Sequence, residues 1–114
     1  MYNTCMILLI RTKATQAQLT EMSVQYDGYI KVVVDVARGI LAGGAERHVD
    51  EEQALLDDGS AQADLWGGGF DRETKEIDYN SMINLRPGQG NPSRDILLAD
   101  IRKQFDTIVR KLLL

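Results

Sequence analysis

The sequence has only one cysteine, one histidine and one tryptophan in 114 residues. Because Cys5 has no second cysteine, no disulfide framework holds the fold, which suits a reducing cytoplasm. Its place near the chain terminus favours a buried or tolerated thiol over a nucleophile. The apolar run at residues 6–10 is far too short to span a membrane and lacks the layout of a signal peptide. We therefore expect a soluble, cytoplasmic protein with no membrane contact.

Positive charge is also scarce, because 13 Lys and Arg against 17 Asp and Glu give a net charge of −4. This balance argues against general nucleic-acid binding, which needs a basic surface. Residues 46–64 hold seven acids and one arginine, a charge of −6, whereas residues 86–114 hold six bases and three acids, a charge of +3. We expect the two stretches to pair inside the domain or across a homo-oligomer.

The apolar content is sufficient for one core, since 44% of the residues are hydrophobic and a chain of this length needs no metal or disulfide to bury it. The hydrophobic pattern predicts strands at 6–11, 30–35, 40–46, 65–70 and 76–86, and helices at 15–28, 50–58 and within 93–113.

This order predicts a single α+β domain over residues 1–114, with a mixed or antiparallel sheet of about five strands and two long helices packed on it. The alternative is two separate hairpins packed on the C-terminal helix without a continuous sheet. Residues 1–5 are expected to form an N-terminal extension ahead of a second possible start at Met6.

Local signals refine the expected elements. Thr15 and Gln18 have the spacing of a capping box, which satisfies backbone donors at the start of a helix. Gly39 is expected to take a positive φ in the turn at 36–39. Three consecutive glycines at 67–69 weaken a strand and suggest a bulge, or a place where backbone or ligand comes close.

The hairpin register determines which side chains share a face. If Asp35 pairs with Ile40, Lys31 and Asp35 point to the same side of the sheet as Ile40, because side chains alternate along a strand. Glu46 and His48 continue that face if the second strand runs on, and a slip of one residue reverses it.

Several segments together resemble a known family: VVVDVARGILAGG, E-x-H-x-D, LLDDGS, DLWG and INLRPGQGN. This combination resembles a small family of uncharacterised bacterial and archaeal proteins, a domain of unknown function. The likeness covers nearly the whole chain from Met6, and one departure is Gly68, where a larger residue is expected. The resemblance implies a cytoplasmic single-domain protein and no particular activity.

The first candidate site is Glu46, His48 and Asp50, which are spaced two residues apart. Imidazole and carboxylates suit a divalent metal such as Zn, Mn or Fe, and Asp35 and Asp64 are further possible ligands. In this interpretation all three hold the metal, Glu46 and His48 are catalytic, and a carboxylate of Glu46 or Asp35 raises the pKa of the His48 ring. Alternatively these residues are structural, and Asp50 caps the acidic helix that follows.

The second candidate site is the glycine-rich loop from Arg86 to Asn91, with Arg94 soon after it. Backbone N–H groups ahead of a helix and two guanidinium groups suit a phosphate or carboxylate. The loop matches neither the P-loop nor the dinucleotide pattern. Ordinary loop glycines and salt bridges to the acidic stretch explain it equally well. Trp66 is a core or interface anchor, or else a stacking platform for a substrate.

Two functions follow from these alternatives. The first is a non-enzymatic ligand-binding or assembly module that forms a homo-oligomer, in keeping with the uneven charge and the lack of a catalytic motif. The alternative is a small metal-assisted hydrolase acting on a phosphorylated or otherwise anionic substrate. If the protein is such a hydrolase, the side chains of His48 and Arg86 must line the same cleft.

Overall fold

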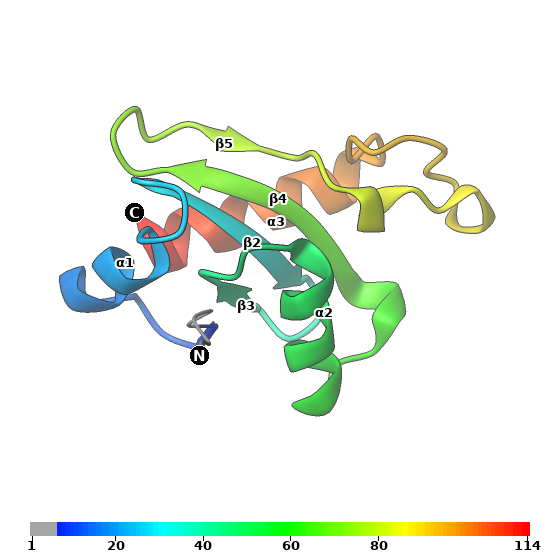
Figure 1. Cartoon of the computed structure of the whole chain (residues 1–114). Helices are drawn as coiled ribbons and strands as arrows, with labels where there is room; N and C mark the ends of the chain where they lie inside the picture. Colours follow the sequence, from blue (N-terminus) through cyan, green and yellow to red (C-terminus); the bar gives the residue numbers. More distant parts are fainter. Residues whose placement is uncertain (1–6) are drawn as a thin grey trace.

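A computed structural model describes residues 7–114, and its centre is a five-stranded antiparallel sheet (Figure 1). The strands lie side by side in the order β1 (Leu8–Ile10), β3 (Ile40–Gly43), β2 (Tyr29–Asp35), β4 (Leu65–Asp71) and β5 (Ile77–Asp78). The single α+β domain predicted from the sequence is confirmed. The alternative without a continuous sheet is wrong, because β2 pairs along its length with β4 as well as with β3.

The hairpin of β2 and β3 has the predicted register. Asp35 pairs with Ile40, and Gly39 has the expected positive φ of 69° in the turn. Val33 therefore lies on one side of the sheet, and Val32 and Val34 lie on the other. However, β3 ends at Gly43, so the strand does not carry Glu46 and His48 along that face.

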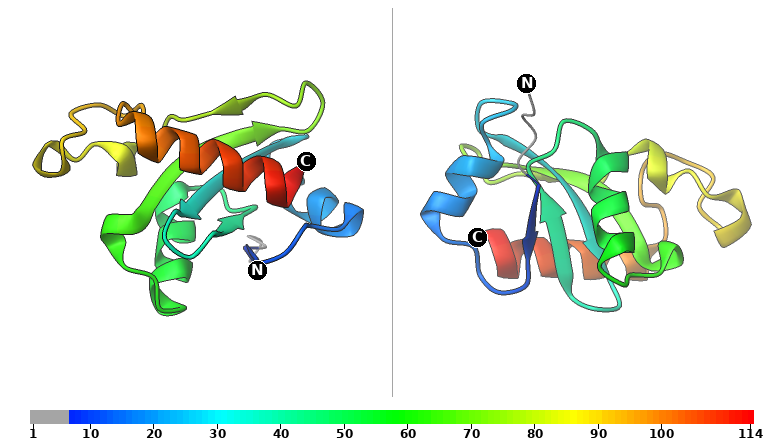
Figure 2. Two further views of the ribbon diagram at one scale, coloured as in Figure 1. Left: turned by 180° about the vertical axis from the view of Figure 1, so that it is seen from behind. Right: turned by 60° about the horizontal axis from the view of Figure 1, so that its bottom comes forward.

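Helices cover both sides of the sheet (Figure 2). The helices α1 (Gln16–Met22) and α3 (Ala99–Leu113) pack on one side, over a core that includes Val32, Trp66 and Phe105. The helix α2 (His48–Asp57) packs on the other side over Val33, Leu55 and Leu65. Full burial of such side chains stabilises the fold by about 1.5–3 kcal/mol each.

The prediction of two long helices is corrected to one long and two shorter ones. The helix α3 has 15 residues, α2 has 10 and α1 has 7. The predicted capping box of Thr15 and Gln18 starts α1, which ends at Met22, several residues before the expected stop. The helix α2 begins at His48, so its N-cap is Arg47 and not the predicted Asp50.

Other groups of the protein pack closely against the three glycines of β4, residues 67–69. A Cβ on Gly67 would lie 2.6 Å from Cβ of Ser81, and one on Gly69 would collide with the ring and hydroxyl of Tyr29. A Cβ on Gly68 would meet Phe105 at 2.6 Å on the opposite side. The predicted close approach of backbone is found at Gly68, where a Cβ would also meet the main-chain oxygen of Asp78, whereas Gly67 and Gly69 are approached by side chains.

The predicted strand at residues 76–86 is mostly wrong. Only β5 is a strand, and it is followed by the 3-10 turns η2 (Met82–Asn84) and η3 (Pro87–Gln89). A third 3-10 turn, η1 (Gln62–Asp64), precedes β4. The irregular segment 79–98 projects from the sheet at the right of Figure 1. The backbone groups of this segment bond to one another, as in the bond from the N–H of Ile96 to the carbonyl of Tyr79, and to the side chains of two asparagines. An alternating hydrophobic pattern does not reveal these contacts.

Two buried asparagines hold this irregular segment. The side chain of Asn84 accepts a hydrogen bond from the N–H of Gly67 at 2.8 Å and donates to the carbonyls of Gly67, Tyr79 and Arg94 at 2.9–3.0 Å. Asn91 donates to the main-chain oxygens of Asn84, Ser93 and Asp95 and accepts from the N–H groups of Leu97 and Leu98. Each amide thus replaces several hydrogen bonds of a regular element.

Within residues 7–114, no helix combines the length and apolar character needed to cross a membrane. The expected N-terminal extension and Cys5 lie outside the described residues.

Candidate functional site

The structure does not bring Glu46, His48 and Asp50 together as a metal site. Glu46 is exposed and accepts a long 3.5 Å hydrogen bond from Gln25. Asp50 forms an ion pair with Arg47 at 3.3 Å. Among residues 7–114, no three His, Cys, Asp or Glu side chains form a group that would hold a metal ion.

The two further possible ligands also lie elsewhere. Asp35 is buried at the end of β2, where it accepts hydrogen bonds from the N–H groups of Ala37 and Arg38, both at 2.9 Å. Asp64 ends the 3-10 turn η1 in front of β4. Neither Asp35 nor Glu46 hydrogen-bonds the ring of His48, so the expected carboxylate–imidazole pair is absent from the described residues.

His48 instead bonds the backbone of β4. Its Nε2 lies 2.7 Å from the carbonyl oxygen of Gly68. Because a carbonyl only accepts, the hydrogen belongs to Nε2, and Nδ1 carries the lone pair of the neutral ring. Burial is the main cause that lowers the pKa of His48, opposite to the raised pKa expected beside a carboxylate. The ring is therefore uncharged at neutral pH.

Glu51, one turn along α2, is a buried carboxyl group. Its Oε2 accepts a hydrogen bond from the N–H of Ala45 at 3.0 Å, and its Oε1 has no partner within residues 7–114. Burial raises the pKa of Glu51 well above its usual value, although the positive charge of Lys31 acts in the opposite direction. A carboxyl group in this setting tends to hold its proton.

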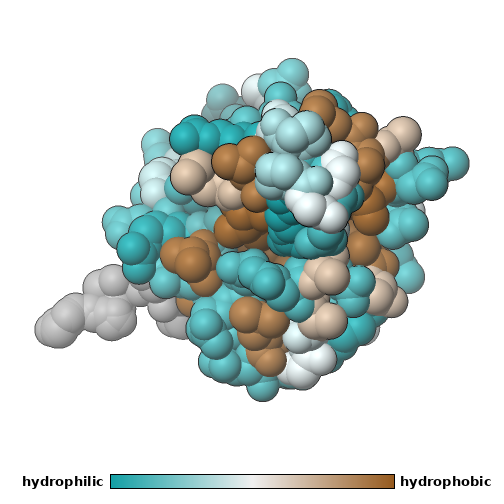
Figure 3. Space-filling view, turned by 90° about the vertical axis from the view of Figure 1, so that its right-hand side faces the viewer, coloured by the Kyte–Doolittle hydropathy of each residue, from teal (hydrophilic) through white to brown (hydrophobic). Residues whose placement is uncertain are grey.

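A pocket opens beside the His48 ring, and we call it the His48 pocket. It has a volume of about 280 Å³. It is lined by Lys31, Arg47, His48, Val49, Ser81, Met82 and Ile83. Val49 and Met82 are 50% and 62% exposed, so the pocket has an apolar rim. Figure 3, a side view of the molecule, shows apolar groups lying between hydrophilic ones on this end. Arg86 does not line the pocket, so the two halves predicted for a hydrolase do not share this cleft.

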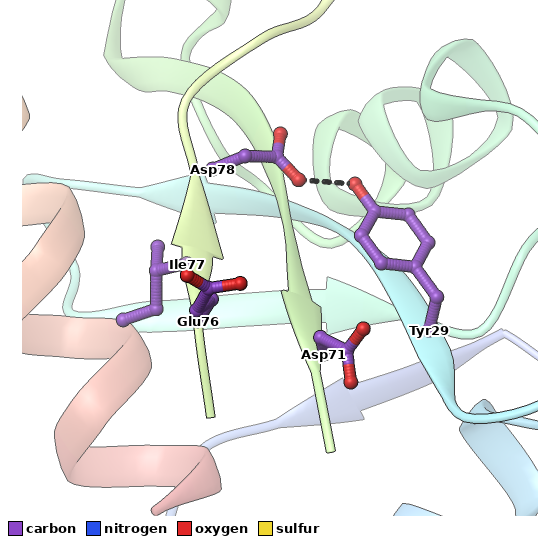
Figure 4. A pocket seen from close by; sticks show the side chains of 5 residues that line it. All are labelled: Tyr29, Asp71, Glu76, Ile77 and Asp78. Atoms are coloured by element: carbon purple, nitrogen blue, oxygen red, sulfur yellow. Dashed lines mark hydrogen bonds between the residues drawn. The ribbon is translucent and has the colours of Figure 1, made fainter. Parts of the chain in front are cut away.

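A second, acidic pocket of about 360 Å³ lies at the end of β4 and β5 (Figure 4). The hydroxyl of Tyr29 donates to the carboxylate of Asp78 across Gly69. Burial and this hydrogen bond raise the pKa of Tyr29. Asp71 also lines the pocket and accepts hydrogen bonds from two backbone N–H groups of the following turn. The polar groups of Asp71 and Asp78 thus have partners in the protein.

The side chain of Arg86 bonds to main-chain groups and packs on an aromatic ring. Its guanidinium donates to the main-chain oxygens of Ile83 at 2.8 Å and Gln62 at 3.0 Å, and to that of Leu65. It also stacks on Trp66, with 4.5 Å between the guanidinium carbon and the ring centroid. Burial lowers the pKa of Arg86. This arginine joins the segments before and after β4.

The other residues predicted to bind an anionic substrate are Trp66, Asn91 and Arg94. Trp66 is 1% exposed, as expected of a core anchor, and Asn91 is buried by the contacts described above. The loop at 86–91 is closed by hydrogen bonds between the main chains of Arg86 and Asn91, and α3 starts only at Ala99. The side chain of Arg94 is exposed. An anion clamp at these residues stays a prediction without a described cleft.

A family model described as a protein of unknown function (DUF5674) matches residues 8–112. The chain belongs to the DUF5674 family. The resemblance seen in the sequence is thus confirmed as a domain of unknown function, while a bacterial or archaeal range and a cytoplasmic location stay predictions. No curated protein and no solved structure matches the chain. The DUF5674 assignment supplies no activity.

Some features of the His48 pocket could be predicted from the sequence of this DUF5674 member. The hairpin register placed Lys31 on the correct side of the sheet, and the three glycines marked the close approach. Ser81 and Met82 were missed because they were assigned to a regular strand. Glu51 was missed because an acidic helix is ordinarily solvated, and no local signal shows that its side chain is buried.

Proposed function

We propose that this protein is a non-enzymatic binding module that takes a small, partly apolar molecule into the His48 pocket. The observation that carries the proposal is the composition of this pocket. A neutral imidazole and the ammonium of Lys31 lie beside the apolar side chains of Val49, Met82 and Ile83. Small-molecule sites combine apolar walls with a few polar groups that orient the ligand.

The polar groups define the chemistry of the ligand. The Nδ1 lone pair of His48 accepts a hydrogen bond, and Lys31 attracts a negative charge. The positive charge of Arg47 is already paired with Asp50. A small monocarboxylate with an apolar body, such as benzoate, therefore suits the pocket better than a highly charged phosphate.

The binding test is an NMR titration of the ¹⁵N-labelled protein with benzoate. We expect the amide signals of residues 47–49 and 81–83 to shift in a saturable way. Met82→Gln should weaken the binding, whereas Val24→Gln, at a site 75% exposed and outside the pocket, should not. The proposal fails if those signals do not move, or if both variants bind benzoate as the wild type does.

Self-association is the second part of the proposal. The ion pairs within residues 7–114 are Arg11–Asp58, Arg38–Asp35, Arg38–Asp58, Arg47–Asp50 and Arg110–Asp106. None joins the acidic stretch 46–64 to the basic stretch 86–114, so this charge complementarity is left for a second copy of the chain. We expect light scattering to give a multiple of the 12.7 kDa chain mass at about 50 mM salt and a smaller mass at about 500 mM. A monomer at both would contradict self-association.

The alternative function, a metal-assisted hydrolase of an anionic substrate, finds less support. It needs the carboxylates of Glu46 and Asp50 to turn toward His48, yet their contacts lie with Gln25 and Arg47. Elemental analysis of the purified protein separates the two functions. One equivalent of a divalent metal, lost in His48→Ala, would favour the hydrolase.

A further inference from the structure

A third pocket, far from His48 in the fold, gathers positive charge, and we call it the basic pocket. Its volume is about 240 Å³. Lys13 comes from the segment before α1, and Arg72 and Lys75 come from the turn between β4 and β5. These segments meet the end of α3 at the left of Figure 1. Among residues 7–114, no Asp or Glu side chain lines the pocket.

Hydrogen bonds to neutral side chains orient the guanidinium of Arg72, and no carboxylate neutralises its charge within residues 7–114. Its Nη1 donates to the hydroxyls of Thr20 and Ser23 at 3.4 and 3.2 Å, and its Nη2 donates to the side-chain oxygen of Gln16 at 3.4 Å. Arg72 forms no ion pair with a carboxylate of residues 7–114, unlike Arg38 and Arg110. The three neutral oxygens fix the group, and its positive charge remains.

The contacts leave one edge of this guanidinium open. Among the described residues, no acceptor is bonded to Nε of Arg72, and only one of the two Nη2 hydrogens is used. Nε–H and one Nη2–H therefore remain as donors for the oxygens of a carboxylate or phosphate. Lys75 adds a point charge at the same pocket. Lys13 does so in part, because it also donates to the main-chain oxygen of Leu114.

The uncharged residues that line the basic pocket indicate which kind of group the rest of the ligand carries. Leu19, Phe70 and Leu113, each at most 7% exposed, form its apolar floor, and the pocket also includes Ala14, Gln16 and Leu114. Arg72 and Lys75 carry two positive charges, which match a dianion better than a single carboxylate, while Lys13 is held by the main-chain oxygen of Leu114. We propose that the basic pocket binds a small organic phosphate, with the phosphate on Arg72 and Lys75 and its apolar group on Phe70 and Leu113. This site is independent of the His48 pocket.

Calorimetric titration of the full chain with phenyl phosphate tests this proposal, with inorganic phosphate and phenol as partial probes. We expect phenyl phosphate to bind at least about threefold more tightly than either part, because each part contacts only half of the pocket. Arg72→Gln should weaken phenyl phosphate binding by about tenfold or more, through loss of a charged, two-point contact.

Lys75→Gln provides a second variant, since the Lys75 side chain makes no hydrogen bond or ion pair within residues 7–114 and the fold does not depend on it. It should also weaken binding, by about threefold or more. Lys103→Gln on α3 makes the same charge change outside the pocket and should leave the affinity unchanged. Absence of phenyl phosphate binding, or equal affinity in the Lys75 and Lys103 variants, would overturn the proposal. Binding lost in Arg94→Gln instead would move the phosphate to the loop at 86–91.

Discussion

The ring of His48 donates from Nε2 to the main-chain oxygen of Gly68 over 2.7 Å. This bond joins the first residue of α2 to the middle of β4, and it is possible because Gly67 leaves room for the ring, with its Cδ2 3.2 Å from where a Cβ would lie. The same contact that orients the imidazole toward the pocket therefore also ties a helix to the sheet.

Replacing His48 tests both roles. His48→Ala removes one partly buried hydrogen bond and should lower the free energy of unfolding by about 1 kcal/mol, measured by urea denaturation. His48→Gln retains a side-chain N–H donor and should recover part of the loss. If the alanine variant is as stable as the wild type, the bond to Gly68 does not stabilise the fold.

The same variants separate the pH dependence of His48. Burial lowers the pKa of the folded ring, so the folded chain binds a proton less readily than the unfolded chain. The contribution of the neutral ring is complete above the unfolded value near ~6.5 and is lost as pH falls through the folded pKa. Below about pH 6.5 the wild type should therefore lose stability relative to His48→Gln. A constant difference from pH 8 to pH 5 would contradict the lowered pKa.

Glu51 should have the opposite slope. Its folded pKa is raised, so its stabilising contribution is complete below the unfolded value near ~4.3 and is lost as pH rises through the folded pKa. Glu51→Gln keeps an oxygen for the N–H of Ala45 and cannot ionise. Its stability relative to the wild type should increase as the pH is raised from about 4.3 toward alkaline values in urea titrations. Parallel pH profiles would show that Glu51 ionises normally.

The glycines of β4 differ in what a methyl group would meet. Gly69→Ala places a Cβ on the ring and hydroxyl of Tyr29 and should break its bond to Asp78, at a cost of about 1–3 kcal/mol or more. Gly88→Ala adds the same methyl group where nothing lies within 4 Å, and thermal unfolding should show little change. Equal melting temperatures for the two variants would refute this account of β4.

Asn84 should matter more than an exposed asparagine of the same segment. Asn84→Ala leaves both backbone groups of Gly67 without partners, whereas the carbonyls of Tyr79 and Arg94 keep the N–H groups of Ile96 and Ser81. We expect a loss on the order of 3 kcal/mol. Hydrogen exchange should speed up across residues 79–94. Asn80→Ala removes one exposed bond to Asp95 and serves as the control. If both variants exchange alike, Asn84 does not hold the segment.

The regular parts of the fold were predictable because they follow local rules. The capping box at Thr15, the turn at Gly39 and the apolar runs of β2 and β4 each act over a few residues. The segment after β5 was not predictable in this way. Its alternation of apolar and polar residues resembles that of a strand. Its structure instead depends on hydrogen bonds from the side-chain amides of Asn84 and Asn91 to backbone groups, including those of Gly67 in β4.

The candidate sites likewise combine features that the sequence shows with contacts that only the folded chain shows. The only histidine was expected to have a carboxylate partner, but its partner is a backbone carbonyl, which sequence patterns do not mark. Lys13 lies dozens of residues before the turn that holds Arg72 and Lys75, and only the folded chain brings the three to one pocket. Arg86 was expected to be free for a ligand because an arginine engaged with carbonyl groups looks no different in the sequence.

The amide of Asn84 has one more consequence, for the behaviour of the protein in concentrated solution. The short strand β5 stops opposite Gly69, and two residues along, the side chain of Asn84 occupies both the N–H and the carbonyl of Gly67. An exposed strand edge is a template on which another chain can add a strand and begin to aggregate. One side chain here occupies the backbone positions that such a strand would need, and it protects a glycine-rich edge that has no side chains of its own to do so.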